Sequence, residues 1–525
     1  MFRQERRLGY ARIGFVEIDG EKYRTPILID YTKKPKIVDI MDFGKAPTVL
    51  EIIDRKRSEI LGSKDKNFVI VTGLSTLKPK ELVEYIHRLR LSTYKPIYAV
   101  ALATPLNLPL LYYMGIDIFD NILAIVKAYQ GIYMTEFHEF NVESLKEPVC
   151  NCPVCLEQDF SFEGLAKHNT YVMKKVLNTM IREDLRNLVE AWVKFSPELT
   201  AMLRFVDKLE ANSFPRFNRY KVTMTTEHSF TRPEITQFLE RAVECYRPKG
   251  KALIILPCSA KKPYSMSKSH TTIRNYVGEV WKRGFEEIIV SSPLVSPRVF
   301  ELTYPIVNYD VAVSGDWSCD EIEFVSIHLS KFIEKGEFEV VIGHVVNGYR
   351  RVVEKTARDL GLDVVWTVEK DVTSIESLKR LKKVVESFEF DGFDLNMSIF
   401  EHMVRYQFDV DFKIDRVKGR YPNLEFYKGD RIARIDINYG CLDIDISFSR
   451  FLIKKSKYYV EIDNFKPRGT IFAVGVKRAD ERIRPNDIVA FYNDEYIGVG
   501  RALMCGKEML ENEGKAVEVR KVEPR

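Results

Sequence analysis

The sequence lacks the features that mark membrane and secreted proteins. It contains no run of eighteen apolar residues, and residues 1–7 include no apolar signal core. We therefore expect a soluble, cytoplasmic protein with no membrane partner. Cysteine is also scarce, at eight residues in 525. In a cytoplasmic chain, thiols are more often metal ligands or catalytic groups than disulfide partners.

Neither sign of charge is in large excess. Lys and Arg number 80 and Asp and Glu number 75, which leaves a formal net charge of +5. This bias favours polyanionic partners without identifying one, so the position of cation clusters is more informative than their sum. Hydrophobic residues make up 45% of the chain, and its length predicts three or four globular domains.

The most informative loop, residues 257–270, contains none of the Gly, Asn or Asp residues that ordinary surface turns use. It follows an apolar run, 252–256, that is typical of a buried strand. In open α/β sheets, ligands bind at the carboxyl ends of such strands. The loop offers a thiol, amines, a phenol, hydroxyls and an imidazole, carried by Cys258, Lys261, Lys262, Tyr264, Ser265, Ser267 and His270.

Cys258 is the candidate nucleophile of this loop. A thiol reacts as its thiolate, and a nearby Lys, protonated His or helix N-terminus lowers its pKa from about 8.5. Such cations lie within a dozen residues, and we expect a helix to begin near Thr271 and run to Lys282. A thiolate adds readily to an electrophilic carbon such as that of a nitrile. The alternative is a buried structural cysteine beside a basic loop that faces RNA.

Residues 236–390 are predicted to form one α/β unit around this loop. The expected strands are 288–290, 311–313, 340–342 and 364–368, and the expected helices are 321–335, 348–360 and 375–386. This alternation is typical of a parallel sheet covered on both faces. Asp310 and His344 are the best candidates for acid–base catalysis, because each lies at the end of a predicted strand. Arg298, Glu301, Asn308 and Asp316 also lie near strand ends, where a cap or a satisfied buried polar group is the alternative.

Residues 1–205 also alternate between strand and helix patterns, which suggests part of an α/β barrel. The expected strands are 68–73, 96–102 and 116–120, and the expected helices are 80–91 and 108–114. Working residues of such barrels lie at the carboxyl ends of strands, and Asp120 has that position. A linker over about 208–235 follows this region.

A cluster of metal-ligating residue types follows Asp120. Cys150, Cys152 and Cys155 lie within six residues, and His168 is thirteen residues further on. Three thiolates and one imidazole form a tetrahedral set with no open position, which is typical of structural zinc. His138 is the other candidate for the fourth ligand.

The carboxyl-terminal third divides into two β-rich segments. Residues 395–455 carry alternating patterns, such as 435–439 and 442–446, that predict a small module with one polar face. Two interpretations of its cations stay open: they contact phosphate, or they are simply solvated. These cations are Arg416, Lys418, Arg420, Arg431 and Arg434. Residues 457–525 contain short strands separated by Gly, Pro and Asn turns, which predict a compact barrel.

The amino-terminal region resembles tRNA-guanine transglycosylase. The match lies in residues 115–120, residues 131–135, the cysteine cluster and the helix that opens at His168. The resemblance implies that Asp120 stands in the place of the nucleophile and that the Cys3His set holds zinc. The Asp-Ser-Gly-Gly-Phe-Gln base-pocket motif of that family is absent; the most similar segment, residues 41–46, does not supply it. The region is also too short for eight barrel units, so base exchange through Asp120 is the weaker hypothesis.

The last segment resembles a PUA domain, an RNA-binding module of several RNA-modifying enzymes. The similarity covers 469–476, 483–489, 497–502 and 514–520. The resemblance implies that RNA meets the face near Lys477, Arg478 and Arg484. Phosphate contacts there would supply affinity with little sequence readout.

The combination of these regions resembles the archaeosine synthase family. The family pattern is Pro-Cys, three residues, Lys-Pro-Tyr, two residues, Ser, two residues, His, and it is matched at every position by Pro257, Cys258, Lys262, Pro263, Tyr264, Ser267 and His270. The resemblance implies modification of 7-cyano-7-deazaguanine at position 15 of the D-arm of archaeal tRNA. It leaves two nitrogen donors open: lysine, with a radical SAM partner that completes archaeosine, or glutamine in an amidinotransferase. Nothing in the chain resembles a glutaminase domain, which favours lysine.

We therefore expect an α/β multidomain protein: a partial, transglycosylase-like α/β barrel with a zinc site (1–205), a central α/β catalytic domain (236–390), a small β-rich module (395–455) and a PUA β-barrel (457–525). The hypothesis is a transferase with Cys258 as nucleophile. An acid (His270, Asp310 or His344) protonates the nitrile nitrogen, and Lys262, Tyr264 and Ser267 support the thiolate and the substrate. We also expect a homodimer and no DNA partner. The alternative from another class is a non-catalytic tRNA-binding adaptor.

Overall fold

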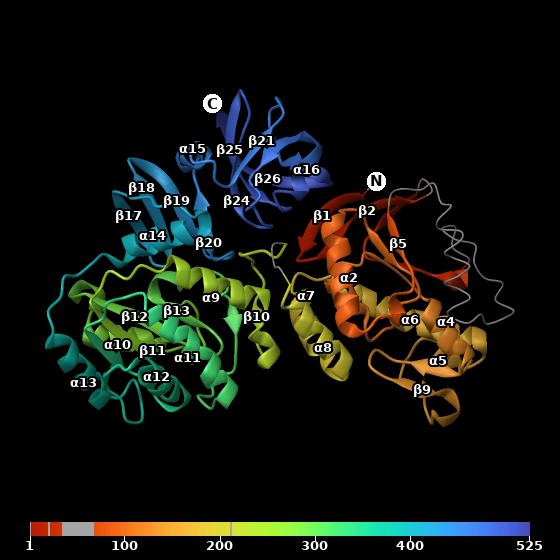
Figure 1. The fold of residues 1–525 in the computed structure, drawn as a ribbon, viewed down its shortest axis with the longest axis horizontal. Coiled ribbons are helices and arrows are strands. Elements are labelled where there is room, and N and C mark those ends of the chain that lie inside the picture. Colours follow the sequence, from red (N-terminus) through yellow and green to blue (C-terminus); the bar gives the residue numbers. More distant parts are fainter. Residues whose placement is uncertain (1, 19–20, 34–67, 210–212) are drawn as a thin grey trace. The chain divides into compact units, whose positions relative to one another are not determined.

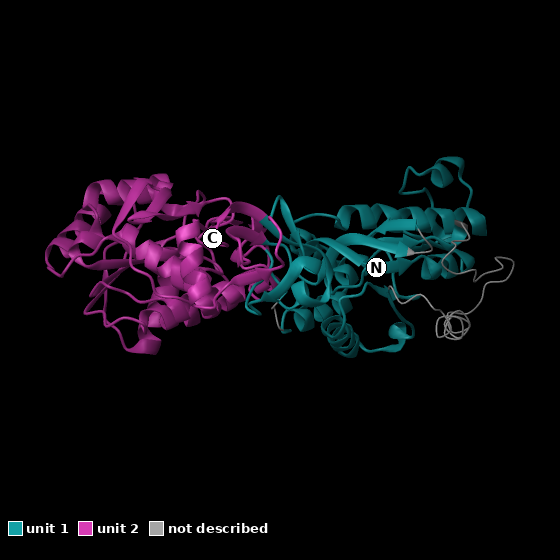
Figure 2. Cartoon of the chain, turned by 90° about the horizontal axis from the view of Figure 1, so that it is seen from above, with its two compact units in different colours: residues 1–214, 467–485, 502–518 teal, residues 215–466, 486–501, 519–525 magenta. Residues whose placement is uncertain are grey.

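The computed structural model describes residues 2–18, 21–33, 68–209 and 213–525 (Figure 1). The chain forms two compact units (Figure 2). Unit 1 comprises residues 1–214, 467–485 and 502–518, and unit 2 comprises residues 215–466, 486–501 and 519–525. Residues 41–46, compared above with the base-pocket motif, lie outside the described residues. In the described parts of the chain, no helix is both long and apolar enough to cross a bilayer.

Unit 1 contains a parallel sheet that carries the transglycosylase-like region. Its strand order is β4 (Ile27–Ile29), β7 (Ile118–Asp120), β6 (Ile97–Ala99) and β5 (Val69–Val71). The connecting helices are α2 (Pro79–Ser92), α3 (Leu108–Tyr113) and α4 (Ile122–Tyr129). On α2 the residues that enter the core are Leu82, Val83 and Ile86, which share one helical face. The four described strands form part of a barrel, as the α/β pattern predicted.

The rest of unit 1 consists of helices and antiparallel pairs. The helices are α5 (Pro153–Glu157), α6 (Phe162–Met180), α7 (Leu185–Trp192) and α8 (Pro197–Val206), and β8 (Ile132–Met134) pairs with β9 (Glu139–Asn141). The first strand, β1 (Phe2–Leu8), pairs with β2 (Ala11–Ile18) and, in parallel, with β26 (Glu513–Pro524). Gly514 has φ +111°, and a Cβ there would lie 2.3 Å from the carbonyl oxygen of Gln4, so only glycine permits this pairing.

Unit 2 is built on a five-stranded sheet in the order β13 (Val295–Pro297), β12 (Phe285–Val290), β11 (Ala252–Pro257), β15 (Val340–Gly343) and β16 (Val364–Trp366). The last four strands are parallel, as expected, whereas β13 is an antiparallel edge strand that the sequence did not predict. The prolines in and beside this segment argued against a strand, because proline is tolerated only at sheet edges and strand ends. Helices α10 (Lys268–Val277) and α13 (Ile375–Glu386) cover one face of the sheet, and α11 (Cys319–Ile333) and α12 (Asn347–Leu360) pack against each other.

Two expectations for unit 2 were wrong. Residues 311–313 form no strand, because their side chains are largely exposed and gain no burial; Val313 is 45% exposed. Instead, β14 (Tyr309–Asp310) pairs with β10 (Val222–Thr223) in a separate two-stranded sheet. The helix expected from Thr271 to Lys282 begins earlier, because Ser267 caps it by accepting a hydrogen bond from the His270 amide. It also ends earlier, at Val277, because Gly278 follows with φ +95°.

The β-rich module begins and ends with helices that the alternating pattern did not predict. These are α14 (Leu395–Phe408) and α15 (Ile446–Lys454). Between them lies an antiparallel sheet in the order β17 (Arg416–Arg420), β18 (Asn423–Lys428), β19 (Asp430–Asp436) and β20 (Cys441–Ile444). One face of this sheet is buried through Leu424, Phe426 and Leu442. The opposite face is polar, as expected.

Most strands of the final segment are short, as the turn pattern predicted, but its last strand, β26, is twelve residues long. In unit 2, β24 (Ile488–Tyr492) pairs in parallel with β21 (Tyr459–Ile462) and antiparallel with β25 (Tyr496–Ala502). In unit 1, β22 (Thr470–Phe472) pairs antiparallel with β26, β23 spans Val476–Ala479, and α16 spans Glu508–Glu511. The remaining helix of unit 2, α9, spans Pro233–Cys245.

Candidate active site

Cys258 lies directly after β11, the central strand of the unit 2 sheet. All six residues of β11 are buried, and the Cys258 amide donates to the carbonyl of Val290 at 2.9 Å, which extends the sheet by one bond. The side chain is 7% exposed, and its Sγ lies 3.3 Å from the hydroxyl of Tyr349 on α12. The loop therefore starts at the carboxyl end of the sheet, where the strand pattern predicted it.

Phenol groups surround this thiol. The Tyr264 and Tyr309 hydroxyls are 2.6 Å apart, and Tyr309 donates to the hydroxyl of Ser291 at 2.7 Å. Burial raises the pKa of Tyr264, Tyr309 and Tyr349 above the usual range, so all three are neutral proton donors. The interaction of Tyr309 with Cys258 acts in the same direction. The buried sulfur thus has a polar group, the Tyr349 hydroxyl, within hydrogen-bond distance.

Lys262 is the cation that belongs to this cluster. Its Nζ lies 3.9 Å from the centre of the Tyr309 ring, at the distance of a cation–π contact. Desolvation lowers the pKa of Lys262, while its attraction to Cys258 and Asp310 opposes that shift. Of the lysines expected to assist the thiol, this one is electrostatically linked to it.

His270 is held by the protein through both ring nitrogens. Its Nε2 donates to the carbonyl of Pro257 at 2.9 Å, and its Nδ1 accepts from the guanidinium of Arg298 at 3.1 Å. Burial, and then the neighbouring Arg298 charge, lower the pKa of His270 to about 3. A neutral imidazole with both nitrogens occupied fixes the strand–loop junction beside Cys258 and has no free position for a substrate.

Arg298 organises a buried ionic network under the loop. It donates to Glu287 at 2.8 Å, to Glu301 at 2.7 Å and to the hydroxyl of Ser265 at 3.0 Å. Glu301 also accepts from the Ser265 amide and from the hydroxyl of Tyr421. Although burial opposes its charge, Glu287 and Glu301 raise the pKa of Arg298 above its usual range. This network connects both ends of the loop to the sheet.

The two acid–base candidates lie at strand ends as expected, His344 directly after β15 and Asp310 at the end of β14, but neither lies beside Cys258. His344 is fully buried; its Nδ1 lies 2.8 Å from the Thr367 hydroxyl, and its Nε2 donates to the carbonyl of Val372 at 2.8 Å. Burial lowers the pKa of His344 to about 4. Asp310 is exposed on β14 and pairs with Lys221 at 3.3 Å. The structure thus brings Cys258, Lys262 and Tyr264 together and leaves Asp310 and His344 outside their hydrogen-bonded cluster.

Three members of the cluster have no sequence signal of their own: Tyr309, Tyr349 and Ser291. Tyr349 lies in the first turn of α12, ninety-one residues after Cys258. The start of that helix, directly after a strand of the parallel sheet, is the one local clue, because such positions face the carboxyl edge.

The four metal-ligating residues converge in unit 1. The ligand atoms of Cys150, Cys152, Cys155 and His168 lie within 4.8 Å of one another. Cys152 Sγ is 3.5 Å from Cys155 Sγ and 3.4 Å from His168 Nδ1. His168 Nε2 donates to the carbonyl of Met134 at 2.9 Å, which leaves Nδ1 as the ligand atom. A tetrahedral zinc with bonds of about 2.3 Å requires ligand separations of about 3.7 Å. The donor set therefore fits zinc, and His138 lies outside it.

Asp120 is buried at the end of β7, and both oxygens of its carboxylate accept hydrogen bonds from other groups of the protein. One oxygen accepts from the Tyr98 hydroxyl and the Ala101 amide, both at 2.9 Å, and the other accepts from the Ile122 amide at 3.0 Å. These bonds give Asp120 a role in holding the strand ends together.

The cations expected to face RNA lie in unit 1. Lys477 and Arg478 are exposed on β23, and Arg484 is half-buried after it. Their side chains make contacts of their own, so their part in RNA binding remains a proposal.

Comparison with known proteins gives each region a family. A domain of unknown function matches residues 235–385, a pre-PUA domain matches 393–453, a PUA domain matches 463–522, and queuine tRNA-ribosyltransferase matches 54–187. The chain is 35% identical to archaeosine synthase subunit alpha of Methanosarcina acetivorans, over 81% of this chain and 74% of that one. It is 34% identical to archaeosine synthase of Haloferax volcanii (81% and 76%) and 30% identical to that of Methanocaldococcus jannaschii (97% and 90%).

Fold and similarity together define a transglycosylase-related, tRNA-modifying class of protein with a PUA domain. Within that class, the chain belongs to the archaeosine synthase family, because it covers more than two thirds of relatives that are at least 30% identical.

Proposed function

We propose that this protein adds an amine to the nitrile of 7-cyano-7-deazaguanine at position 15 of tRNA, with lysine as the amine. The observation that carries the proposal is a thiol at the carboxyl end of the central strand, surrounded by neutral phenols and a lysine. Family membership supports archaeosine formation as the outcome. In this proposal the catalytic domain is 236–390, and residues 1–205, 395–455 and 457–525 form the other domains.

The first chemical step forms a thioimidate. The Cys258 thiolate attacks the nitrile carbon, a carbon–sulfur bond forms, and one carbon–nitrogen π bond breaks. The electron pair moves to nitrogen, which takes a proton from a phenol. Tyr349 is the donor that the geometry favours, because its hydroxyl lies 3.3 Å from the sulfur. In this role Tyr349 replaces His270, Asp310 and His344, whose partners or exposure leave them less suited to it.

The second step releases the enzyme. The amine nitrogen attacks the same carbon, transfers a proton to the Tyr349 phenolate, and expels Cys258 as the thiolate. The product is a substituted amidine, in which every atom of nitrile and amine is retained. Lys262 supports the thiolate as its neighbouring cation. Tyr264 holds Tyr309 in place, while Ser267 and His270 act as positioning residues that shape the loop around Cys258.

RNA binding in this proposal uses the PUA segment and its cations Lys477, Arg478 and Arg484. The match to a PUA domain over 463–522 supports a tRNA substrate. A base inside the tRNA elbow must be unstacked before a buried thiol can reach it. A radical SAM partner that completes archaeosine and a homodimeric state belong to the same proposal.

Mass spectrometry of digested nucleosides tests this function. Nitrile-bearing tRNA is incubated with the full chain and either lysine or glutamine. We expect lysine to raise the mass of the modified nucleoside by that of one whole lysine, because nothing leaves in the addition. Conversion to the formamidine with glutamine alone would establish the amidinotransferase instead. An unchanged nucleoside mass with stoichiometric tRNA binding would establish the adaptor alternative.

Zinc has a structural place in this proposal. Cys150, Cys152, Cys155 and His168 would hold it with no open coordination position, so it supplies folding energy and takes no part in the reaction. It would tie α5 and α6 to β8, the strand that carries the carbonyl bonded to His168.

We expect Cys152→Ser to release the metal and destabilise unit 1. A loss of about 3 kcal/mol would lower the melting temperature by roughly 6–12 °C for a unit of this size. Elemental analysis measures the bound zinc, and differential scanning calorimetry measures the transition. Cys319→Ser is the matched control, since Cys319 is an exposed free thiol on α11 of unit 2. An unchanged zinc content and melting curve for Cys152→Ser would refute the assignment.

A further inference from the structure

Unit 2 contains a cavity that reaches the reactive loop and has an unusual charge pattern. It measures about 520 Å³ and is lined by Arg219, Lys262, Asn308 and the turn Ile437–Tyr439, which joins β19 to β20. Among its described lining residues there are two cations, two amides and a phenol, but no carboxylate. A site of this composition offers hydrogen-bond donors and positive charge, which suits an anionic ligand.

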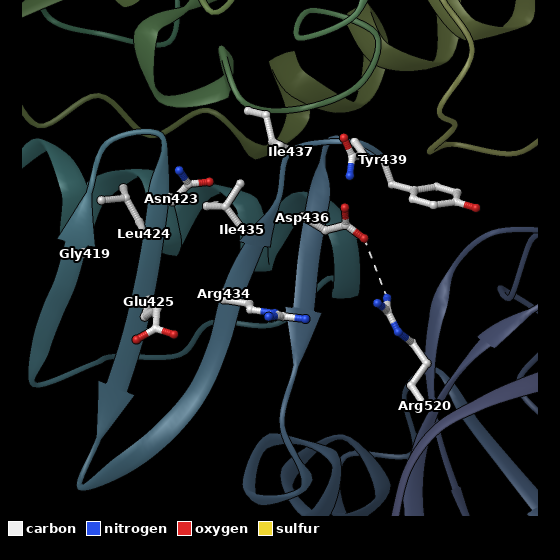
Figure 3. Close-up of a pocket in the computed structure, with 11 residues that line it drawn as sticks. Gly419, Asn423, Leu424, Glu425, Arg434, Ile435, Asp436, Ile437, Tyr439 and Arg520 are labelled. Atoms are coloured by element: carbon white, nitrogen blue, oxygen red, sulfur yellow. Dashed lines mark ion pairs between the residues drawn. The ribbon is translucent and has the colours of Figure 1, made fainter. Parts of the chain in front are cut away.

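The same turn lines a second cavity of about 540 Å³ over the polar face of the module sheet (Figure 3). Its cations, Arg434 and Arg520, both pair with Asp443, at 3.0 and 3.3 Å. Its carboxylates are already paired: Asp436 with Arg501 at 3.0 Å and with Arg520 at 3.6 Å, and Glu425 with Arg431 at 2.7 Å. The charges that line this cavity therefore largely compensate one another, and an excess of positive charge has to come from a neighbouring strand.

The edge strand β17 adds positive charge to that polar face. Arg416, Lys418 and Arg420 alternate along β17, so they point to one side of the sheet. Lys418 is in register with Glu425 and Arg420 with Asn423, so these two cations lie beside lining residues of the second cavity, whereas Arg416 is in register with Tyr427, further along β18. The described residues provide no ion pair for them; Arg416 and Lys418 instead lie over the ring of Tyr427, at 5.1 and 4.9 Å.

From this arrangement we propose that the cavity at Ile437–Tyr439 is a subsite for a phosphodiester of single-stranded RNA, next to the reacting nucleotide. The inference rests on the proposed function and deepens it. Lys262 belongs to both the cavity and the cysteine cluster, which places the bound phosphate beside the reaction centre. The strand would continue over the second cavity toward β17. Arg219 and Asn438 would then donate to phosphate oxygens or to a 2′-hydroxyl.

The charge pattern decides between RNA and the amine donor as occupant. A free amino acid carries an ammonium as well as a carboxylate, and a carboxylate of the protein is the strongest partner for that ammonium. The cavity has no carboxylate among its described lining residues, whereas a phosphodiester requires donors alone. Two adjoining cavities of more than 500 Å³ each also suit an extended chain better than one small molecule.

The test measures tRNA binding and turnover for Arg219→Gln and Asn438→Ala in the full chain. We expect each variant to raise the Kd and the KM for tRNA about 5- to 10-fold, with the KM for the amine donor unchanged. In Arg219→Gln the slope of log binding constant against log salt should fall by about 0.7, the contribution of one phosphate contact on a single strand. Arg358→Gln is the control, because Arg358 is an exposed arginine in the last turn of α12. It should match the wild-type protein.

Two outcomes would overturn the subsite. A raised KM for the amine donor with unchanged tRNA binding would assign the cavity to the donor. Unchanged tRNA binding, salt slope and kinetics, in variants with wild-type melting temperatures, would show that nothing binds there. Binding and salt slope are measured on tRNA without turnover. A wild-type protein that binds tRNA but forms no amidine would therefore refute the proposed function, while tRNA binding by the variants and the wild-type protein could still be compared.

Discussion

Cys258→Ala is expected to abolish amine addition while the Kd for tRNA stays within twofold of the wild-type value. The nucleophile makes the bond that replaces one difficult addition with two easier steps, so its loss should lower kcat by about 10³-fold or more. The side chain is small and buried, and its polar contact is the Tyr349 hydroxyl, so the fold should survive the change. Single-turnover nucleoside mass spectrometry measures the rate, and filter binding measures tRNA affinity.

Cys245→Ala is the matched control for this experiment. Cys245 is also a buried free thiol of unit 2, but it lies on α9, and burial raises its pKa. It should retain wild-type turnover. Near-wild-type turnover of Cys258→Ala would mean that the amine attacks the nitrile directly and that Cys258 only packs. Cys258→Ser further distinguishes thiolate catalysis from direct attack by the amine, since a serine hydroxyl keeps the size of the side chain but not the nucleophilicity of a thiolate.

Arg298→Met is expected to cause the largest loss of stability in unit 2. It would leave the fully buried Glu301 and the largely buried Glu287 without the guanidinium that binds both. Removing one partner from a buried ion network costs about 3–5 kcal/mol, because the remaining charge keeps its desolvation penalty. Urea titration of the full chain measures the free energy of unfolding. A change of less than about 1 kcal/mol would show that the network contributes little.

The same variant should also reduce catalysis in molecules that remain folded. Arg298 donates to His270, which in turn bonds the Pro257 carbonyl beside Cys258. Loss of that donor frees the imidazole and loosens the loop, so kcat should fall more than the KM for tRNA rises. Arg380→Met is the control: Arg380 pairs with Glu369 at 2.6 Å, but both side chains are more than half exposed. It should leave stability and activity unchanged, because solvent screens such pairs.

Local patterns predicted much of the fold. The apolar run before Cys258 could be recognised as the buried strand β11 because all six of its residues face the core on either side of the sheet. The Cys3His set could be recognised from spacing, since three thiols within six residues reach one point through a single turn. A local pattern also gave the wrong prediction for residues 311–313. Their alternating valines resemble a strand, but these side chains are not buried.

The surroundings of Cys258 could not be predicted in this way. Tyr349 and Tyr309 come from elements 91 and 51 residues further along the chain, and the one local clue is that Tyr349 lies at the start of a helix that follows a strand. His270 belongs to the loop motif and looked like an acid. Its role depends on Arg298, twenty-eight residues further along the chain, whose guanidinium donates to Nδ1. A titratable residue acquires its role from the groups that fill its hydrogen bonds, and those come from distant segments.

The sequence by itself determined the order of the regions, the strand that presents Cys258, the metal-ligating set and the membership of the family. These depend on contacts within a short stretch of chain or on residue spacing. Only the tertiary structure decided which groups surround the thiol, that His270 and His344 have both nitrogens occupied, and that two cavities meet at the turn Ile437–Tyr439. Packing brings those groups together across the whole length of unit 2, and the backbone path that does so is not encoded in any one segment.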